Sequence, residues 1–300
     1  MKYHLIALFT VLVWGTTFVS TKVLLRSLSP LWILLLRFII GFAVLCVLRP
    51  HILRLNDRKH ELLFIAAGAT GIAAYYLLEN VALVFATATS VGVIVAASPL
   101  FTAILSAFLG DRSSLNARFF VGFVLAMGGL VVVGFGADPE DMAASFGSAS
   151  ALGGLLALSA ALVWAVYSIL VQKIAALGYE TLASTKRTFF WGLVFIVPAS
   201  ILFDGHLVSP AVLLQWGNAA NLLFLGVVAS AACFVTWGAS VKHLGPTTSS
   251  TYIYLVPAIT ATASVMILGE PLNVLIALGV LMTIAGLILS QGRKPATSKR

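Results

Sequence analysis

The stretch VWGTTFVSTK, residues 13–22, occurs twice in this chain in related forms. The second copy reads VWAVYSILVQK at residues 163–173, which places Trp164 150 positions after Trp14. Each copy combines a Val-Trp pair, a small or polar helical face and a closing lysine within an apolar run. Repetition at this separation indicates a chain built from two related halves.

The composition indicates a protein that crosses a membrane several times. Of the 300 residues, 60% are hydrophobic and 9% are charged, whereas a soluble domain has about 45–50% apolar and about 25% charged residues. So few polar groups could not cover the apolar surface of a water-soluble fold. Apolar runs of about 18–23 residues match the helix length that crosses about 30 Å of hydrocarbon. The sequence therefore predicts an all-α, polytopic membrane protein.

The hydropathy pattern predicts ten transmembrane helices. They are expected at residues 4–24, 31–48, 62–84, 88–109, 119–136, 151–171, 181–203, 219–241, 247–268 and 273–290. A polar link at residues 138–150 divides them into a first five-helix repeat, residues 1–137, and a second, residues 151–292. Residues 293–300 form a basic tail that is expected in the cytoplasm.

The two repeats are expected to be inverted relative to each other. Arg37 corresponds to Arg187 and Pro99 to Pro257, and a unit with five spans reverses the direction in which its copy enters the bilayer. With the N-terminus inside, fifteen of the eighteen Lys and Arg residues fall on the cytoplasmic side, as the bias of cytoplasmic loops predicts. Both termini are therefore expected in the cytoplasm. Inverted repeats are typical of secondary transporters, in which the substrate site lies between the halves.

These features resemble the drug/metabolite transporter superfamily. The first span carries a W-G-x-x-F type motif in Trp14, Gly15 and Phe18, and the spans of Pro99 and Pro257 end in Leu-Gly-Asp and Leu-Gly-Glu-Pro. The match is strongest to EamA-type exporters, and among them to bacterial exporters of aromatic and other neutral amino acids. The resemblance implies a multi-pass protein of the inner cell membrane that exports small organic metabolites. The sixth span departs from the motif, with alanine and serine in place of Gly15 and Phe18.

Polar and aromatic residues within the spans are candidates for the substrate pathway. An indole N–H or a hydroxyl in hydrocarbon requires a hydrogen-bond partner or a water-filled cavity, and Trp14 and Thr17 share a helical face, as do Trp164 and Tyr167. Helix–helix packing remains the alternative for these faces. The expected pathway residues are Trp14, Thr17, Tyr75, Tyr76, Glu79, Asn80, Ser98, Trp164, Tyr167, Trp237, Tyr252 and Tyr254.

Two charged residues lie within the outer half of their spans. An ionisable group inside the membrane is by default a functional candidate, and Glu79 is the one carboxylate placed well inside a span. We expect Arg37 and Glu79 to contact each other as a gate pair at the outer vestibule, with snorkelling of Glu79 as the alternative. Arg187, the counterpart of Arg37, is expected to reach cytoplasmic water.

Prolines and glycines within the spans suggest mechanical roles. Pro99 and Pro257 interrupt their helices and free carbonyl groups, which favours hinges, with static kinks as the alternative. A set of glycines is expected to permit close helix packing: Gly122, Gly128, Gly129, Gly279 and Gly286.

The sequence contains no recognisable enzyme, nucleotide or metal motif. The basic residues are dispersed, which argues against nucleic-acid binding, and Cys46 and Cys233 lie in apolar runs. We therefore expect no cofactor, no metal and no ATP, and as partners a small-molecule substrate and the lipid bilayer; the oligomeric state stays open, with a monomer as one option. The predicted function is a secondary transporter that exports aromatic or neutral amino acids by alternating access. A multidrug or cationic-compound exporter and a channel-like facilitator remain alternatives.

Overall fold

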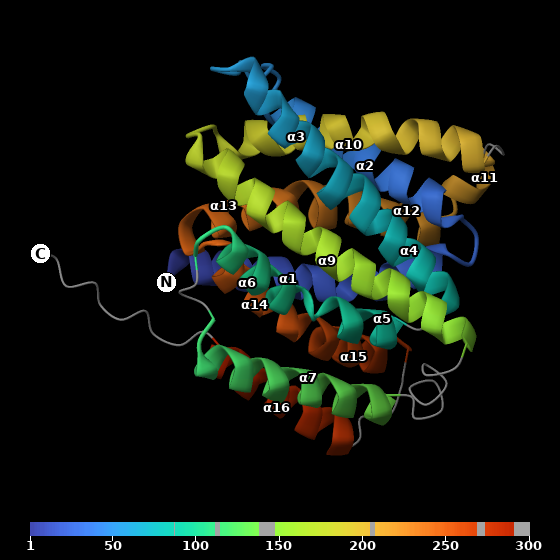
Figure 1. The fold of residues 1–300 in the computed structure, drawn as a ribbon. Coiled ribbons are helices and arrows are strands. Elements are labelled where there is room, and N and C mark those ends of the chain that lie inside the picture. The colour runs from blue at the N-terminus through green and yellow to red at the C-terminus, as the bar shows by residue number, and fades with distance from the viewer. Residues whose placement is uncertain (87, 112–114, 138–147, 205–207, 269–273, 291–300) are drawn as a thin grey trace, which may run out of the picture.

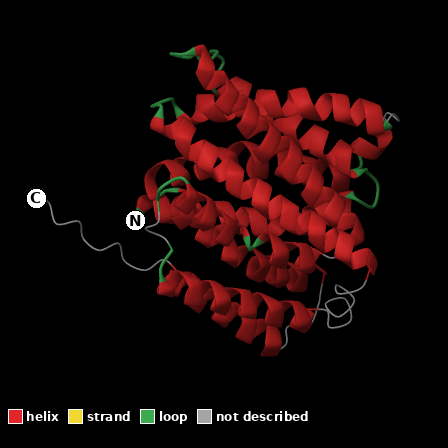
Figure 2. Cartoon of the chain, viewed as in Figure 1, coloured by secondary structure: helices red, strands yellow, loops and turns green. Residues whose placement is uncertain are grey.

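The computed structural model describes residues 1–86, 88–111, 115–137, 148–204, 208–268 and 274–290. Within these ranges all regular structure is helical and no strand occurs (Figure 2). Most of the predicted link, residues 138–147, and the predicted basic tail, residues 293–300, lie outside the described residues.

The chain forms corresponding sets of helices in its two halves. The first half contains α1 (Lys2–Leu24), α2 (Pro30–Leu48), η1 (Arg58–His60), α3 (Glu61–Ala67), η2 (Gly68–Ala74), α4 (Tyr75–Phe85), α5 (Ala88–Val95), α6 (Ser98–Phe108) and α7 (Ala117–Ala137). The second half contains α9 (Ser148–Ala176), α10 (Thr181–Phe203), α11 (Pro210–Leu213), α12 (Trp216–Leu223), η3 (Phe224–Ala232), α13 (Cys233–Leu244), α14 (Pro246–Thr251), η4 (Tyr252–Tyr254), α15 (Leu255–Leu268) and α16 (Val274–Ser290).

Six helices of the described chain are long and apolar enough to cross a membrane. They are Lys2–Leu24, Pro30–Leu48, Arg58–Phe85, Leu152–Ala176, Thr181–Phe203 and Trp216–Leu244. Shorter apolar helices occur at Ser98–Phe108, Ala117–Gly129 and Ala277–Ser290. An all-helical protein with several membrane-capable helices is confirmed, whereas ten crossings stay a prediction. The predicted spans 88–109 and 247–268 are each divided into shorter helices.

The third helical rod of each half contains a π-helical segment. Segment η2 joins α3 to α4, and η3 joins α12 to α13 in the corresponding part of the second half. A π-helix replaces the usual backbone pairing by i→i+5 hydrogen bonds and often marks a functional site. Both halves therefore place altered backbone geometry at the same position in their rods.

Helix α9 crosses the middle of the molecule, and α7 and α16 form a pair at one edge (Figure 1). Helix α9 packs against α4, α5, α6 and α13, while α1 packs against α13 and α15. Helices α7 and α16 approach backbone to backbone, since a Cβ added at Gly129 would lie 2.6 Å from the Gly279 carbonyl oxygen, and one at Gly122 would lie 2.6 Å from the Ser290 amide nitrogen. Close packing is thus confirmed at these glycines. It is not found at Gly128, where the nearest atom is 3.6 Å away.

The closest approach of the two halves at a π-segment occurs at Gly71. A Cβ added to this glycine of η2 would lie 2.2 Å from Cδ2 of the Tyr167 ring on α9. No side chain fits this space unless the ring or the backbone moves.

We expect Gly71→Ala to lower the free energy of unfolding by about 1–3 kcal/mol, since overpacking a filled site forces its neighbours to shift. Thermal unfolding in detergent, followed by fluorescence-detected size exclusion, measures the change. Gly217→Ala in α12 is the matched control, because nothing lies within 4 Å of its added Cβ. Equal melting temperatures for the two variants would contradict the packing described.

Candidate functional site

Three tryptophans meet at the centre of the molecule. Trp14 of α1, Trp164 of α9 and Trp237 of α13 are 8%, 3% and 0% exposed. The ring centroids of Trp14 and Trp164 are 5.1 Å apart in an edge-to-face arrangement, and Trp237 lies 5.2 Å from Trp14 and 5.5 Å from Trp164. Such contacts stabilise aromatic pairs beyond the burial of their area. The two repeated tryptophans therefore contact each other across the two halves of the chain, and their role in a substrate pathway stays a prediction.

Further rings extend this aromatic cluster. The ring centroid of Tyr75 lies 4.7 Å from that of Trp164. The ring centroid of Tyr167, one turn after Trp164 on α9, lies 5.1 Å from the Trp164 ring. Phe234 contacts Tyr76 and Tyr167 at centroid distances of 6.0 and 5.9 Å. We use "aromatic cluster" for Trp14, Tyr75, Tyr76, Trp164, Tyr167, Phe234 and Trp237.

One hydrogen bond ties the cluster to the π-segment of the second half. The indole Nε1 of Trp14 donates to the carbonyl oxygen of Ala229 in η3 at 3.0 Å. In the described chain the indole nitrogens of Trp164 and Trp237 have no hydrogen-bond partner. Because a buried N–H without a partner is costly, the Trp14 bond fixes the position of α1 against η3, while the other two indoles remain available.

A small cavity lies beside the aromatic cluster. It is lined by Trp14, Thr17, Phe18, Tyr75, Tyr76, Glu79, Val95, Trp164, Ile253 and Val256. The volume of this cavity is about 30 Å³, which is room for a few water molecules only. Six of the expected pathway residues come together here; the apolar ones were missed, although Phe18 follows Trp14 by one helical turn.

A second cavity of similar size lies beyond Tyr167 and Phe234. Its lining consists of Tyr167, Val171, Ile174, Ala175, Tyr179, Thr181, Ser184, Thr185, Thr188, Phe234 and Gly238. Trp164 borders the first cavity and Tyr167 the second, so the aromatic cluster separates them. The hydroxyl residues of α10 were not expected in a pathway, although the run TLASTKRT shows them at helical spacing.

The predicted contact between Arg37 and Glu79 is not formed. The ion pairs found in the described ranges join Arg49 to Glu180 and Arg187 to Glu61. Arg37 instead donates from Nε to the Ser230 hydroxyl at 3.1 Å and stacks over Tyr76, 4.2 Å from the ring centroid. The expectation was wrong because the sequence indicates how deep each residue lies in the membrane, but it does not indicate that the Tyr76 ring lies beside Arg37.

Five expected pathway residues lie outside both cavities. Trp237 belongs to the aromatic cluster, and the other four lie on α4, on α6 and in η4. Asn80 donates to the Pro30 carbonyl at 3.0 Å, and Ser98 to the Val95 carbonyl at 2.5 Å. The Tyr252 hydroxyl lies 2.6 Å from Nδ1 of His4, and Tyr254 is fully buried beside Phe123. Asn80, Ser98 and Tyr252 thus form hydrogen bonds within the protein, whereas the Tyr254 hydroxyl has no hydrogen-bond partner among the described residues.

Both proline spans are broken where the sequence predicted hinges. Pro99 lies in the first turn of α6, after the interruption that separates it from α5. Pro257 lies in the first turn of α15, which directly follows η4, a single 3₁₀ turn. Helices α5 and α15 lie against each other near Gly92 and Pro257. The breaks are structural facts, and motion at them stays a prediction.

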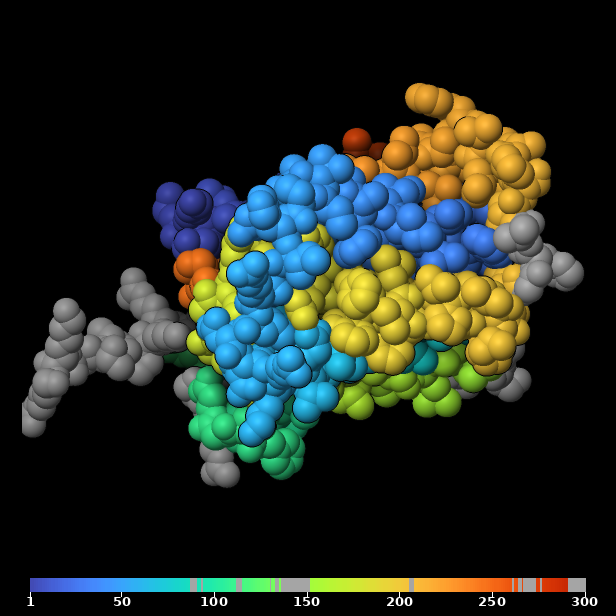
Figure 3. Space-filling model, turned by 90° about the horizontal axis from the view of Figure 1, so that it is seen from above, coloured from blue at the N-terminus to red at the C-terminus, as the bar shows by residue number. Residues whose placement is uncertain are grey.

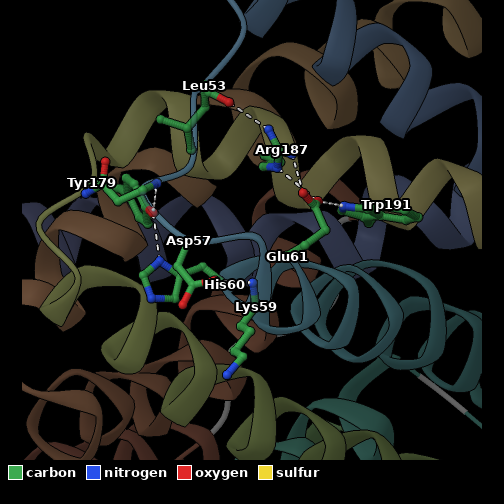
Figure 4. Close-up of polar contacts among 9 residues, drawn as sticks. Leu53, Asp57, Lys59, His60, Glu61, Tyr179, Arg187 and Trp191 are labelled. Carbon is green, nitrogen blue, oxygen red and sulfur yellow. Dashed lines mark hydrogen bonds and ion pairs between the residues drawn. The ribbon is translucent and has the colours of Figure 1, made fainter.

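A polar network joins the loop after α2 to the second half (Figure 4). Arg187 of α10 donates through Nε to Glu61 at 2.9 Å, through Nη2 to the other oxygen of that carboxylate, and through Nη1 to the Leu53 carbonyl at 2.7 Å. The Trp191 indole donates to the same carboxylate at 2.5 Å. Arg187 is therefore paired with Glu61. The sequence had instead led us to expect that its side chain simply reaches cytoplasmic water.

The same loop is held by two further second-half residues. The Tyr179 hydroxyl accepts from the Asn56 amide at 2.9 Å and lies 2.8 Å from Nδ1 of His60. Lys186 donates to the Arg49 carbonyl at 2.5 Å and to the His51 carbonyl at 2.9 Å. Figure 3 shows this first-half segment in light blue against the yellow surface of α10. We call the contacts of residues 49–61 with Tyr179, Lys186, Arg187 and Trp191 the loop clamp.

The opposite end of the molecule is joined mainly by neutral hydrogen bonds. Ser20 donates to Asn221 at 2.5 Å and Ser27 to Asn218 at 3.2 Å, and Ser29 donates to the Asp204 carboxylate. Asn221 occupies the position that corresponds to Glu61 in the repeat. The two ends are therefore related in place but differ in charge.

We expect Glu61→Gln to weaken the loop clamp, because Arg187 and Trp191 lose their anionic acceptor. Cys46 borders the same groove as Glu61, Arg187 and Trp191, so its labelling by a maleimide reports the opening. A partly exposed charged pair contributes about 1 kcal/mol, so labelling should accelerate roughly fivefold.

Glu180→Gln is the matched control for this measurement. Its partner Arg49 and its own side chain are both exposed, and labelling of Cys46 should not change. Cys46→Ser gives the background from the buried Cys233. Equal labelling of Glu61→Gln and the wild type would show that the carboxylate does not hold the loop.

Known proteins resemble this chain over nearly its whole length. An uncharacterized transporter of Archaeoglobus fulgidus is 26% identical, with 98% of each chain covered. A probable amino-acid metabolite efflux pump of Escherichia coli is 28% identical, over 96% of this chain and 94% of its own. A probable terminal-alkyne amino-acid exporter of Streptantibioticus cattleyicolor is 27% identical, over 95% and 91%.

A solved crystal structure shares the fold, with a TM-score of 0.74 and 22% identity over 96% of both chains. The EamA-like transporter family matches at residues 1–135 and again at residues 151–291. These matches, together with the membrane-capable helices, show that this chain is a membrane transporter and not an enzyme. It belongs to the EamA-like transporter family.

Proposed function

We propose that this protein is a secondary transporter that exports amino acids, aromatic or neutral ones first, across the inner cell membrane. The observation that carries the proposal is the first cavity, in which aromatic rings from both halves surround the buried carboxylate of Glu79. Aromatic faces attract an ammonium group, and a carboxylate pairs with it. The names of the relatives from Escherichia coli and Streptantibioticus cattleyicolor, an efflux pump and an exporter for amino-acid compounds, support the same substrate class.

The mechanism we propose is alternating access between two inverted five-helix repeats that make ten crossings, with both termini in the cytoplasm. The family matches twice, and the π-segments and broken proline helices recur at corresponding positions. Near-equivalent halves can exchange conformations of similar free energy. The two cavities are too small for an amino acid, so substrate entry requires the aromatic cluster to move.

The loop clamp is expected to open during this cycle. It joins the two halves at the end predicted to face the cytoplasm, so an inward-open state requires its contacts to separate. The opposite end can open after the loss of fewer charged contacts. The broken helices of Pro99 and Pro257 are the proposed hinges.

A multidrug exporter for organic cations is the second candidate. The same rings and Glu79 suit a hydrophobic cation as well as an amino-acid ammonium. A channel-like facilitator is less favoured, because the aromatic cluster separates the two cavities and a facilitator needs a continuous path.

Counterflow in proteoliposomes tests these assignments. Vesicles loaded with an unlabelled amino acid should accumulate the labelled compound transiently and saturably, and a panel of aromatic amino acids, neutral amino acids and cationic drugs ranks the substrates. Accumulation of cationic drugs without any amino-acid exchange would favour the second candidate. Flux without counterflow would indicate a channel.

We expect Trp164→Leu to slow phenylalanine counterflow by about fivefold, because one aromatic contact contributes about 1 kcal/mol in the cavity wall. Phe195→Leu is the control, since this α10 side chain is exposed on the apolar surface. Size exclusion confirms that both variants are folded. Equal rates for the two would place substrate away from the aromatic cluster.

A further inference from the structure

Arg37 carries a charge in the interior that the protein satisfies only in part. Its side chain lies in the middle of α2 and is 1% exposed. One hydrogen bond joins Nε to the Ser230 hydroxyl of η3, and the guanidinium stacks over the ring of Tyr76. Among the described residues Nη2 has no hydrogen-bond partner. Burial of a guanidinium N–H group without an acceptor is destabilising.

Glu79, one helical turn after Tyr76 on α4, presents the complementary case. It is 4% exposed and borders the first cavity. Its Oε2 atom has no partner within the described part of the chain. Tyr76 and Glu79 are three residues apart on α4 and therefore share a face. Two groups of opposite charge are thus associated with Tyr76, Arg37 over its ring and Glu79 on its helical face, and each keeps a polar atom without a hydrogen-bond partner among the described residues.

The positions of the two groups relative to the cavity differ. Glu79 and Tyr76 line the cavity, whereas Arg37 contacts the Tyr76 ring and is not itself part of the wall. A change in the Tyr76 rotamer would open the cavity wall towards the guanidinium. The bond to Ser230 holds the guanidinium in place meanwhile.

We propose that Arg37 and Glu79 are the two recognition groups for the zwitterionic end of an amino acid, an inference that rests on the proposed function. The guanidinium binds the α-carboxylate, for which its planar donors are suited, and Glu79 binds the α-ammonium. The Tyr76 ring moves aside as the substrate enters. The substrate side chain then lies among Trp14, Tyr75 and Trp164. The protein thereby selects compounds that carry both charges on one end.

Three compounds with the same phenyl group separate these roles. Phenylalanine carries both charges, phenylethylamine lacks the carboxylate, and 3-phenylpropionate lacks the ammonium. Proteoliposomes loaded with unlabelled phenylalanine are given each labelled compound, and exchange is normalised to the amount of monodisperse protein. The wild type should prefer phenylalanine to either analogue by about tenfold or more, since each lost charge-assisted bond costs at least that factor.

The variants should then lose one preference each. In Arg37→Gln the preference for phenylalanine over phenylethylamine should fall by about tenfold, while the preference over 3-phenylpropionate is kept. In Glu79→Gln the pattern should reverse. Arg26→Gln, an exposed arginine in the loop before α2, is the matched control and should keep both preferences.

The outcomes distinguish the inference from the function on which it rests. If Arg37→Gln and Glu79→Gln reduce all three exchanges by the same factor, the residues are structural and the inference is wrong. If the wild type exchanges no amino acid although it exchanges another solute, the proposed function fails and the inference fails with it. Should Arg37→Gln not fold, Arg37→Lys keeps the charge without the planar fork. It should lower phenylalanine exchange but not phenylethylamine exchange, and an unchanged ratio would overturn the proposal.

Discussion

The contact of Trp14 with Trp164 and Trp237 is the interaction on which the rest of the structure depends. The three rings come from α1, α9 and α13, which belong to both halves of the chain. A buried indole N–H without an acceptor is costly, and Trp14 avoids this cost by donating to the Ala229 carbonyl oxygen within the π-segment η3. The altered helix geometry of η3 and the position of α1 are thus linked by one bond. The cavities lie on either side of the rings because the rings fill the space between the halves.

The charged groups are arranged around this centre according to their depth. Glu61 and Arg187 lie where the loop after α2 reaches the second half, and their pair is supplemented by backbone carbonyl acceptors. At the other end the corresponding position carries Asn221, which forms a neutral bond with Ser20. Two related repeats therefore close the two ends of the molecule with different chemistry.

Several properties could be predicted from particular residues. The apolar runs predicted the helices, and the repeated Val-Trp pair predicted that Trp14 and Trp164 occupy related positions. Glu79 was recognised as a candidate because a carboxylate within a span is rare, and it does border the first cavity. Tyr252 and Tyr254 were expected in the pathway as polar aromatic residues within a span. They lie outside both cavities, since helical periodicity alone does not tell which of several neighbours a polar face meets.

The sequence by itself determined that the chain is helical, crosses a membrane and consists of two related halves, because hydropathy and repetition are local properties that can be read along the chain. The tertiary structure alone decided that Arg37 binds Ser230 and Tyr76 and does not contact Glu79, and that Glu61 holds Arg187 across the two halves. Residues far apart in sequence meet only when the helices cross at particular angles and depths. Those angles and depths follow from the packing of rings and glycines, such as Tyr167 against Gly71, and no single segment contains that information.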